Sequence, residues 1–500
     1  MSENARSCLS RQRPAGLRLA KLGVSLVLSS SGCLVGPDFQ RPAPPAVVAY
    51  VAPETPGSPS SAGTAGGQRI AIGERIPAQW WSLFHSTRLD ELLRAAIASN
   101  HTLAAAGATL AQAREAILEA RAGLYPRIDL GAGARRGAQG TGAVSNLFSL
   151  GPSVSYSLDA FGGTRRQVEQ ARALAESQQY ELAAAYLTLT GNAVTESIAI
   201  ASTRLEIATV EDLIANDQRN LDLVQRAFDA GRVARTEVLT AQAQLEADRT
   251  ALPTLRQELS IARHALSILA GKAPGEWSPP EFEIQEFTLP GELPVSLPSQ
   301  LVRQRPDILA AEALLHADSA AIGVATAQMY PAITLSASLT QQALALADLL
   351  RRASRIWSVG SDVETPLAQG GALRAHRRAA IDAYKAQLEI YRQTILQAFG
   401  QVADVLSAIE EDSALAAASQ RALDIAAASL ALQRSSYAAG KTSALQLIVA
   451  ENTYSQARLA FARVQGQRLQ DTAQLLVAVG GGWWGQGDAL LAGGGPPAPP

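Results

Sequence analysis

Four segments of the chain alternate between apolar and polar positions with a period of two; they are residues 127–133, 153–159, 333–340 and 357–364. In the second of these, Val154, Tyr156 and Leu158 lie on one side, and serines with Asp159 lie on the other. A period of two predicts strands with one apolar and one polar face. A soluble antiparallel sheet would satisfy this pattern. The polar positions, however, carry short serine and threonine side chains, which is typical of barrels that face lipid outside and a lumen inside.

Long helices are predicted around these strands. Residues 164–230 contain no proline and only one glycine, and from 168 to 189 their apolar residues follow a three-four stagger of coiled-coil type, with Gln178 as its exception. Gly231 is predicted to turn the chain into a return helix that Pro253 kinks, and Gly440 is predicted to end a second long helix in the same way. The predicted helices are 89–122, 164–230, 236–270, 372–439 and a last one that ends near 479.

Three landmarks occur twice in the same order. Leu-Tyr-Pro at 124–126 recurs as Met-Tyr-Pro at 329–331, and the Gly-Gly pair at 162–163 recurs at 370–371. Ala-Gly-Arg at 230–232 is echoed by Ala-Gly-Lys at 439–441. The nearly constant offset indicates an internal duplication, with two strands and one long helical hairpin in each copy.

The N-terminus reads as an export signal. A basic region is followed by the apolar run 22–32 and then by Cys33. Ser31-Gly32-Cys33 resembles a bacterial lipoprotein processing site, in which the cysteine is acylated; a free cysteine after an ordinary cleavage site is the alternative. Since Cys8 lies in the removed part, the mature chain would hold one cysteine and no disulfide. Leu34, not aspartate, follows Cys33, which by the same resemblance implies sorting to the outer membrane.

Composition and charge narrow the function classes. The net charge is −2 and 18% of residues are charged, which gives no basic footprint for nucleic-acid binding. The five histidines are scattered and none has metal-ligand spacing; they are His85, His101, His264, His316 and His376. No nucleophile-elbow, phosphate-loop or dinucleotide motif occurs. We therefore predict no enzymatic activity and no cofactor apart from a covalent lipid on Cys33.

The strand count predicts an assembly. Two strands in each of two copies give four strands per chain, too few to close a barrel. Eight strands would leave an interior filled by side chains, whereas twelve strands from three chains would enclose an open bore. The expected fold is an α+β membrane protein, with a trimeric 12-stranded β-barrel continuous with a long α-helical barrel. No membrane-spanning helix is predicted in the mature chain.

Several motifs resemble those of one known family. They are Trp80-Trp81, Arg303-Gln-Arg-Pro-Asp-Ile308, the paired Gly-Gly turns and the closing Gly480-Gly-Gly-Trp483. Over about residues 33–484 the chain resembles the TolC-like outer-membrane efflux proteins, in the lipoprotein branch that serves resistance–nodulation–division pumps. The resemblance implies a homotrimer, anchored in the outer membrane of a Gram-negative bacterium and extending into the periplasm. It also implies docking to a periplasmic adaptor and an inner-membrane pump.

The same resemblance implies a gate at the tips of the helical hairpins. Family members carry acidic residues where this chain has Gln446 and Val449, so Leu445 and Val449 are expected to form an apolar constriction instead. Glu237 falls where the family places a carboxylate that tethers neighbouring helices, and Tyr437 is expected in the same latch.

The sequence therefore predicts a passive exit duct for small molecules such as drugs and toxic compounds. Type I protein secretion, metal-ion efflux and a periplasmic coiled-coil structural lipoprotein remain alternatives. The predicted segments are a signal peptide (1–32), a lipid-anchored tether (33–78), repeat 1 (79–271), an equatorial connector (272–298), repeat 2 (299–484) and a flexible tail (485–500).

Overall fold

The computed structural model describes residues 34–47, 49–50, 64–65, 68–74, 76–138 and 144–483. The predicted signal peptide, Cys33 and the predicted tail lie outside the described residues. Two units, each assembled from segments of both repeats, make up the structure. The first draws on residues 1–40, 114–174 and 315–387, and the second on 41–113, 175–314 and 388–500. The segment boundaries predicted from sequence remain predictions.

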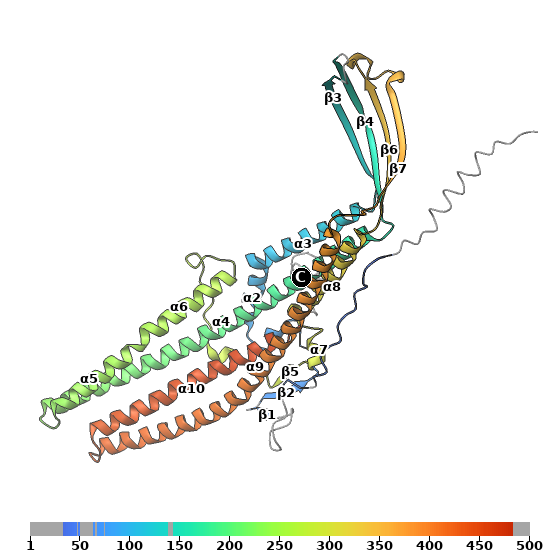
Figure 1. The fold of residues 1–500 in the computed structure, drawn as a ribbon. Coiled ribbons are helices and arrows are strands. Elements are labelled where there is room, and N and C mark those ends of the chain that lie inside the picture. The colour runs from blue at the N-terminus through green and yellow to red at the C-terminus, as the bar shows by residue number, and fades with distance from the viewer. Residues whose placement is uncertain are drawn as a thin grey trace, which may run out of the picture. The chain divides into compact units, whose positions relative to one another are not determined.

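The first unit contains a four-stranded antiparallel sheet in the order β3-β4-β6-β7 (Figure 1). Its strands are β3 (Arg127–Gly137), β4 (Ser145–Leu158), β6 (Ala332–Ala343) and β7 (Arg355–Glu364). Each repeat supplies one hairpin, and β4 pairs with β6 to join the two hairpins. The four predicted strands are thus present, and each is longer than its alternating core. Two short 3-10 turns, η3 (Leu346–Asp348) and η4 (Arg352–Ser354), lie between β6 and β7.

The strand register gives the sheet one apolar and one polar face. Directly paired residues of antiparallel strands lie on the same face. One row across the sheet pairs Ile128 with Val154, Val154 with Ala337, and Ala337 with Val359. The next row is polar; it runs through Asp129, Ser153, Ser338 and Ser358, and the hydroxyl oxygens of the last two are 2.8 Å apart. The alternation seen in single strands therefore extends across all four strands in these central rows.

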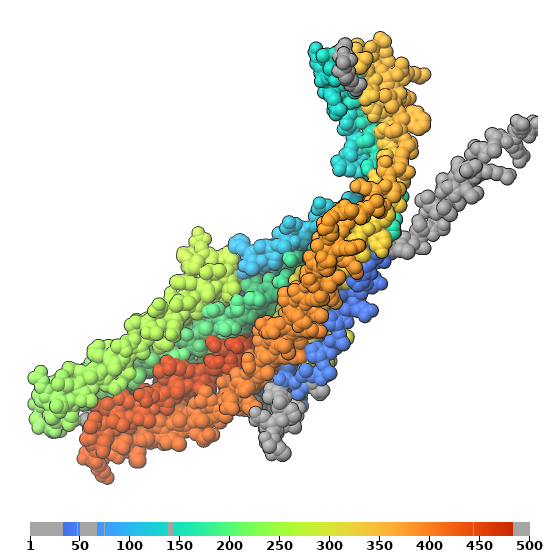
Figure 2. All heavy atoms as spheres, viewed as in Figure 1, coloured from blue at the N-terminus to red at the C-terminus, as the bar shows by residue number. Residues whose placement is uncertain are grey.

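Both edges of this sheet are open in the part of the chain that the structure describes. Strands β3 and β7 each have one neighbour, and every residue of both strands is exposed. The face turned to the viewer in Figure 2, coloured teal and gold, carries no helix of the first unit. Open edges are normally covered or blunted in a protein that functions as a single chain.

Two long helical hairpins follow the strands. The first consists of α4 (Gly163–Asp229), α5 (Arg235–Arg249) and α6 (Ala251–Leu269), and the second of α9 (Ala372–Ala438) and α10 (Ala444–Ala478). The predicted kink is a break at Thr250, because Pro253 has no N–H to donate to the carbonyl of Arg249. The predicted helix 89–122 is wrong as a single helix. Instead, α2 (Thr87–Ser99) ends at Asn100, whose side chain accepts a 2.9 Å hydrogen bond from the Leu103 N–H and begins α3 (His101–Ala122).

The connector and the N-terminal segment pair with each other in the second unit. β1 (Thr64–Ala65), β2 (Gln68–Ile72) and β5 (Glu292–Val295) form a three-stranded sheet, in which β2 and β5 are parallel. Part of the predicted tether is therefore paired with the connector in a sheet. The short helices are η1 (Trp80–Phe84), η2 (Ile284–Glu286) and α7 (Pro298–Leu301).

The core of the second unit holds the sequence motifs together. Trp80 and Trp81 are fully buried. Arg305 donates to the carboxylate of Asp307 at 2.7 Å and to the carbonyl of Ala478 at 3.0 Å, at the end of α10. Trp483 Nε1 donates to the Gln304 carbonyl at 2.8 Å. These contacts thus stabilise the packing of residues 303–308 against the C-terminal end of α10 and Trp483.

One helix in the described part is long and apolar enough to cross a membrane. It is α8 (Pro306–Ala327), with a mean hydropathy of 1.4 over its best window. Because 72% of that window is buried inside the protein, α8 has the character of a core helix.

Candidate functional site

The two hairpin turns have the same backbone geometry. Gly231 and Gly440 take φ angles of +71° and +68°, in the left-handed region that favours glycine. The N–H of Arg232 donates to the Ala227 carbonyl, and that of Lys441 to the Ser436 carbonyl, both at 2.9 Å. This pattern terminates a helix by satisfying its last carbonyls. The structure thus places both predicted tip residues between their helices.

A small apolar cluster joins the two hairpins near these turns. Its buried members are Val224 of α4, Val238 and Ala241 of α5, and Ile448 of α10. The predicted latch residue Tyr437 packs against this cluster and against a second one, formed by Leu430, Leu447 and Ala450. The tips of both repeats are therefore packed together within one chain.

The predicted constriction residues lie on the opposite side of α10. Leu445 and Val449 are 49% and 57% exposed, and four-residue spacing places them on one helix face. Gln446 is exposed and accepts a hydrogen bond from the Thr442 hydroxyl. Two apolar side chains therefore face away from their own chain at the tip.

Glu237 lies in the first turn of α5. Its Oε2 atom is buried and has no hydrogen-bond partner among the described residues. Although Tyr437 packs on the cluster that includes the neighbouring Val238, the structure gives no hydrogen bond between Glu237 and Tyr437. An unsatisfied buried carboxylate oxygen is costly unless a donor reaches it.

A buried polar node links three helices a few turns from the tips, and the sequence analysis did not identify it. Glu451 of α10 is buried, accepts from the Asn220 amide of α4, and accepts from Arg434 Nη2 of α9 at 3.1 Å. Burial raises the pKa of Glu451, and the neighbouring Arg434 lowers it by a smaller amount. This node fixes α4 against the second hairpin.

Two pairs of aspartates lie between antiparallel helices. Asp217 of α4 is 3% exposed, and burial, with the hydrogen bond and charge of Asp248 on α5, raises its pKa to about 8. Asp412 of α9 is likewise buried, and burial together with Asp471 of α10 raises its pKa to about 7. At neutral pH each pair therefore retains a proton much of the time. The sequence held a weak signal for the first pair, because Asp217 lies seven residues from both Val210 and Val224.

The described residues include no group of three or more histidine, cysteine, aspartate or glutamate side chains arranged to hold a metal ion. The two hairpins carry apolar contacts at their tips, one ion-pair node near the tips, and two carboxyl pairs farther along the helices. Groups of this kind stabilise helix–helix packing and do not by themselves prevent the helices from separating.

Comparison with known proteins places this arrangement in a family. The family described as "Outer membrane efflux protein" matches residues 92–272 and 297–481, once in each repeat. The pyoverdine export outer membrane protein OpmQ of Pseudomonas aeruginosa is 31% identical over 416 residues, covering 81% of this chain and 87% of OpmQ. The cation efflux system protein CusC of Escherichia coli is 28% identical over 464 residues, covering 91% of this chain and 97% of CusC.

A solved structure agrees over nearly the whole chain. The outer-membrane channel OprN superimposes with a TM-score of 0.83 at 28% identity, covering 90% of this chain and all of OprN. The sequence resemblance is thereby confirmed, and the alternative of a structural coiled-coil lipoprotein is set aside. The chain belongs to the outer membrane efflux protein family and is an outer-membrane channel protein that functions in efflux.

Proposed function

We propose that three copies of this chain form one exit duct, with a 12-stranded barrel in the outer membrane and a helical barrel that extends into the periplasm. The observation that carries the proposal is the open four-stranded sheet with free edges at β3 and β7. In a ring, β3 of one chain pairs with β7 of the next, which leaves no edge exposed. Three copies give twelve strands, a number that leaves room for a bore.

The dimensions and the two faces of the sheet support its place in a membrane. Its strands are 10 to 14 residues long, and a tilted membrane-spanning strand needs about 9–11 residues. The apolar face meets lipid, and the face of serine, threonine and aspartate lines the lumen. Irregular connections then lie outside the hydrocarbon layer.

The helical tips act as the periplasmic gate in this proposal. Leu445 and Val449 of three chains face one another and close the pore by excluding water. Glu237, whose buried oxygen lacks a partner among the described residues, takes a donor from a neighbouring chain, and Tyr437 packs in the same latch. Opening separates the tips, which an adaptor and a pump bring about.

The family match supports the proposed partners, and the Ser31-Gly32-Cys33 sequence supports the proposed anchor. A periplasmic adaptor and an inner-membrane resistance–nodulation–division pump deliver small molecules such as drugs and toxic compounds. A lipid on Cys33 holds the mature N-terminus in the outer membrane. The family match makes a transport role, rather than catalysis, the basis of the whole proposal.

Cross-linking between the two edges tests the ring. Single cysteines are placed along β3 in a chain that also carries Ser358→Cys on β7, and the purified protein is oxidised. We expect covalent dimers and trimers for matching positions, and each single-cysteine variant serves as its control. Planar bilayers should then show single-channel conductance. A protein that stays monomeric, gives no cross-linked ladder and does not conduct would contradict the proposal.

Cation efflux is a second candidate, because CusC is named as a cation efflux protein. The duct would then carry metal ions delivered by a different pump. Resistance assays separate the two: the chain is expressed with a drug pump and its adaptor, or with a metal pump and its adaptor, in a strain that lacks its own channel. Restored resistance to drugs alone would exclude the second candidate, and restored resistance to metal ions alone would exclude the first.

A further inference from the structure

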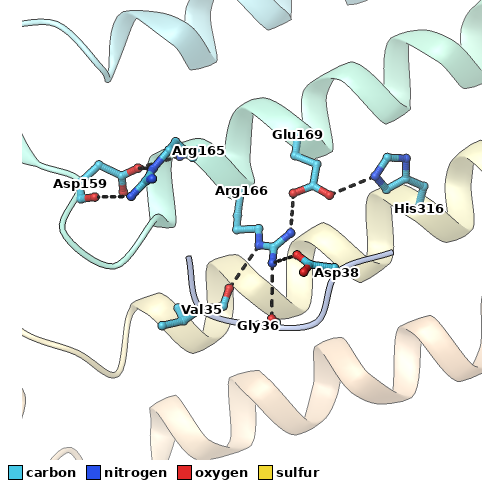
Figure 3. A network of polar contacts seen from close by, with 8 residues as sticks. All are labelled: Val35, Gly36, Asp38, Asp159, Arg165, Arg166, Glu169 and His316. Atoms are coloured by element: carbon cyan, nitrogen blue, oxygen red, sulfur yellow. Dashed lines mark hydrogen bonds and ion pairs between the residues drawn. The ribbon is translucent and has the colours of Figure 1, made fainter. Parts of the chain in front are cut away.

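The first described residues of the chain, 34–39, pack in a defined site of the first unit, which we call the seat (Figure 3). The seat lies where α4 begins and α8 passes beside it. At its centre is Arg166, which is 1% exposed and is the most deeply buried charged side chain among the described residues. Burying an arginine is costly unless acceptors surround it.

Most of these acceptors belong to the N-terminal segment. Arg166 Nε donates to the Val35 carbonyl at 3.2 Å, and Nη2 donates to the Gly36 carbonyl at 3.4 Å and to the Asp38 carboxylate at 2.8 Å. The remaining partner is Glu169, which accepts from Nη1 at 2.7 Å. The fork of the guanidinium thus binds a segment that lies about 130 positions earlier in the chain.

A second contact, between two aromatic rings, also holds the N-terminal segment in the seat. The ring of Phe39 stacks on His316 with centroids 4.5 Å apart and an interplanar angle of 14°. His316 Nε2 in turn lies 3.0 Å from the second carboxylate oxygen of Glu169. Arg166, Glu169 and His316 therefore form one chain of polar contacts (Figure 3), and the N-terminal segment contacts both of its ends.

Glycines allow the segment to lie directly on the helices. A Cβ on Gly36, whose φ is +93°, would come within 2.4 Å of Gly323 Cα on α8. A Cβ on Gly162, in the turn after β4, would come within 2.4 Å of Leu34 Cδ1. Such close approach leaves no room for a side chain and specifies one position for the segment.

The seat lies at the level where the strands end. The Val35 N–H donates to the Phe161 carbonyl at 3.2 Å, three residues after the last residue of β4. The Phe161 ring stacks on Tyr330 at 4.7 Å, two residues before β6, and Tyr125, two residues before β3, is 70% exposed. Aromatic side chains of this kind gather at the boundary between lipid and water.

We infer that Arg166 is a positioning residue for the lipid anchor: it fixes residues 34–39 so that an acylated Cys33 leaves the protein at the membrane boundary. The inference rests on the proposed lipidation of Cys33, which is bonded directly to Leu34. An anchor held at this height inserts its acyl chains into the inner leaflet beside the strands. An anchor on a loose tether would reach a wide range of heights.

Proteolysis of the purified full-length protein tests the seat. Chymotrypsin cuts after Phe39 only when the segment leaves the seat, and the product is a new N-terminus at Gln40. We expect Arg166→Met to produce this product at least about tenfold faster than wild type, because several hydrogen bonds to a charged group are lost. The matched control is Arg172→Met, which alters an exposed arginine on the same helix. It should behave as wild type.

A variant in the segment itself removes the objection that Arg166→Met simply unfolds the helices. Gly36→Val leaves Arg166 in place, clashes with Gly323 and should expose the same cleavage site. In both variants we expect unchanged helix content by circular dichroism and an acylated N-terminal peptide by mass. The fraction of heat-modifiable oligomer in the outer membrane should fall severalfold.

The outcomes distinguish this inference from the function on which it rests. Unchanged cleavage in Arg166→Met would overturn the role of Arg166, and so would fast cleavage with normal assembly in the outer membrane. A wild-type N-terminal peptide without acyl chains would overturn the lipid anchor itself and this inference with it. Normal conductance in that case would leave the channel function standing.

Discussion

Replacing Asp217 by asparagine should stabilise the first helical hairpin, by an amount that increases as the pH rises from 4 toward 8. Asp217 shares a proton with Asp248, which also accepts a 2.8 Å hydrogen bond from the Gln244 amide. An asparagine is neutral at every pH and can donate its amide N–H to Asp248 in place of that proton. The substitution thus keeps the shape of the site and removes its titration.

The sign and size follow from the raised pKa. An aspartate in an unfolded chain has a pKa near 3.8, and burial with Asp248 raises the pKa of Asp217 to about 8 in the folded protein. The stabilisation is complete below pH 4 and is lost as the pH rises toward 8, because the unfolded state releases its proton first. The free energy of unfolding falls by at most about 1.4 kcal/mol per pH unit. Sharing with Asp248 reduces the loss between pH 5 and pH 8 to roughly 2 kcal/mol.

Hydrogen exchange of α4 and α5 measures this difference locally. We compare wild type with Asp217→Asn at the same pH, so that the intrinsic pH dependence of exchange cancels. Between pH 5 and pH 8, the wild-type exchange rate of peptides from 210–224 and 235–249 should increase roughly 30-fold relative to that of the variant at the same pH, which corresponds to about 2 kcal/mol. Asp222→Asn, on the exposed face of α4, is the control. A variant effect of equal size at both pH values would refute the reasoning.

Three further predictions concern the sheet, the gate and the anchor. Gly151→Val should weaken the pairing of β4 with β6 by about 3 kcal/mol or more, because its Cβ would lie 2.1 Å from the Leu339 carbonyl oxygen; an unchanged heat-modified band on gels would contradict this. Val449→Asp should make the closed pore more cation-selective, as measured by reversal potential, and unaltered selectivity would remove the residue from the gate. Cys33→Ser should abolish acylation, and an acylated mass or full membrane retention in the variant would argue against the anchor.

The sequence predicted the repeated elements well, because each has a strong local signal. Period-two alternation located all four strands, and two glycines with positive φ located both hairpin turns. The break at Asn100 was missed because asparagine is tolerated inside a helix pattern and its capping role depends on neighbours. The pairing of β2 with β5 was missed because the two strands lie more than 200 positions apart. Long-range pairing of short strands leaves little local pattern.

The candidate site was only partly accessible from the sequence. Exposure of Leu445 and Val449 follows from where α10 packs, which the family resemblance could suggest but the periodicity did not establish. The node around Glu451 combines residues from three helices, and no short motif encodes it. From the sequence alone, Arg166 cannot be distinguished from a surface arginine, because only the fold shows that the N-terminal segment lies over it.

The two bare strands at the sheet margins also have a consequence for biogenesis. Before the proposed ring closes, each newly exported chain carries two unsatisfied rows of backbone donors and acceptors, next to an apolar face. Such a chain would adhere to any other extended polypeptide in its compartment. Folding of the sheet is therefore expected to be completed only together with oligomerisation, so that its yield depends on local concentration and on holdase chaperones that mask the margins in transit.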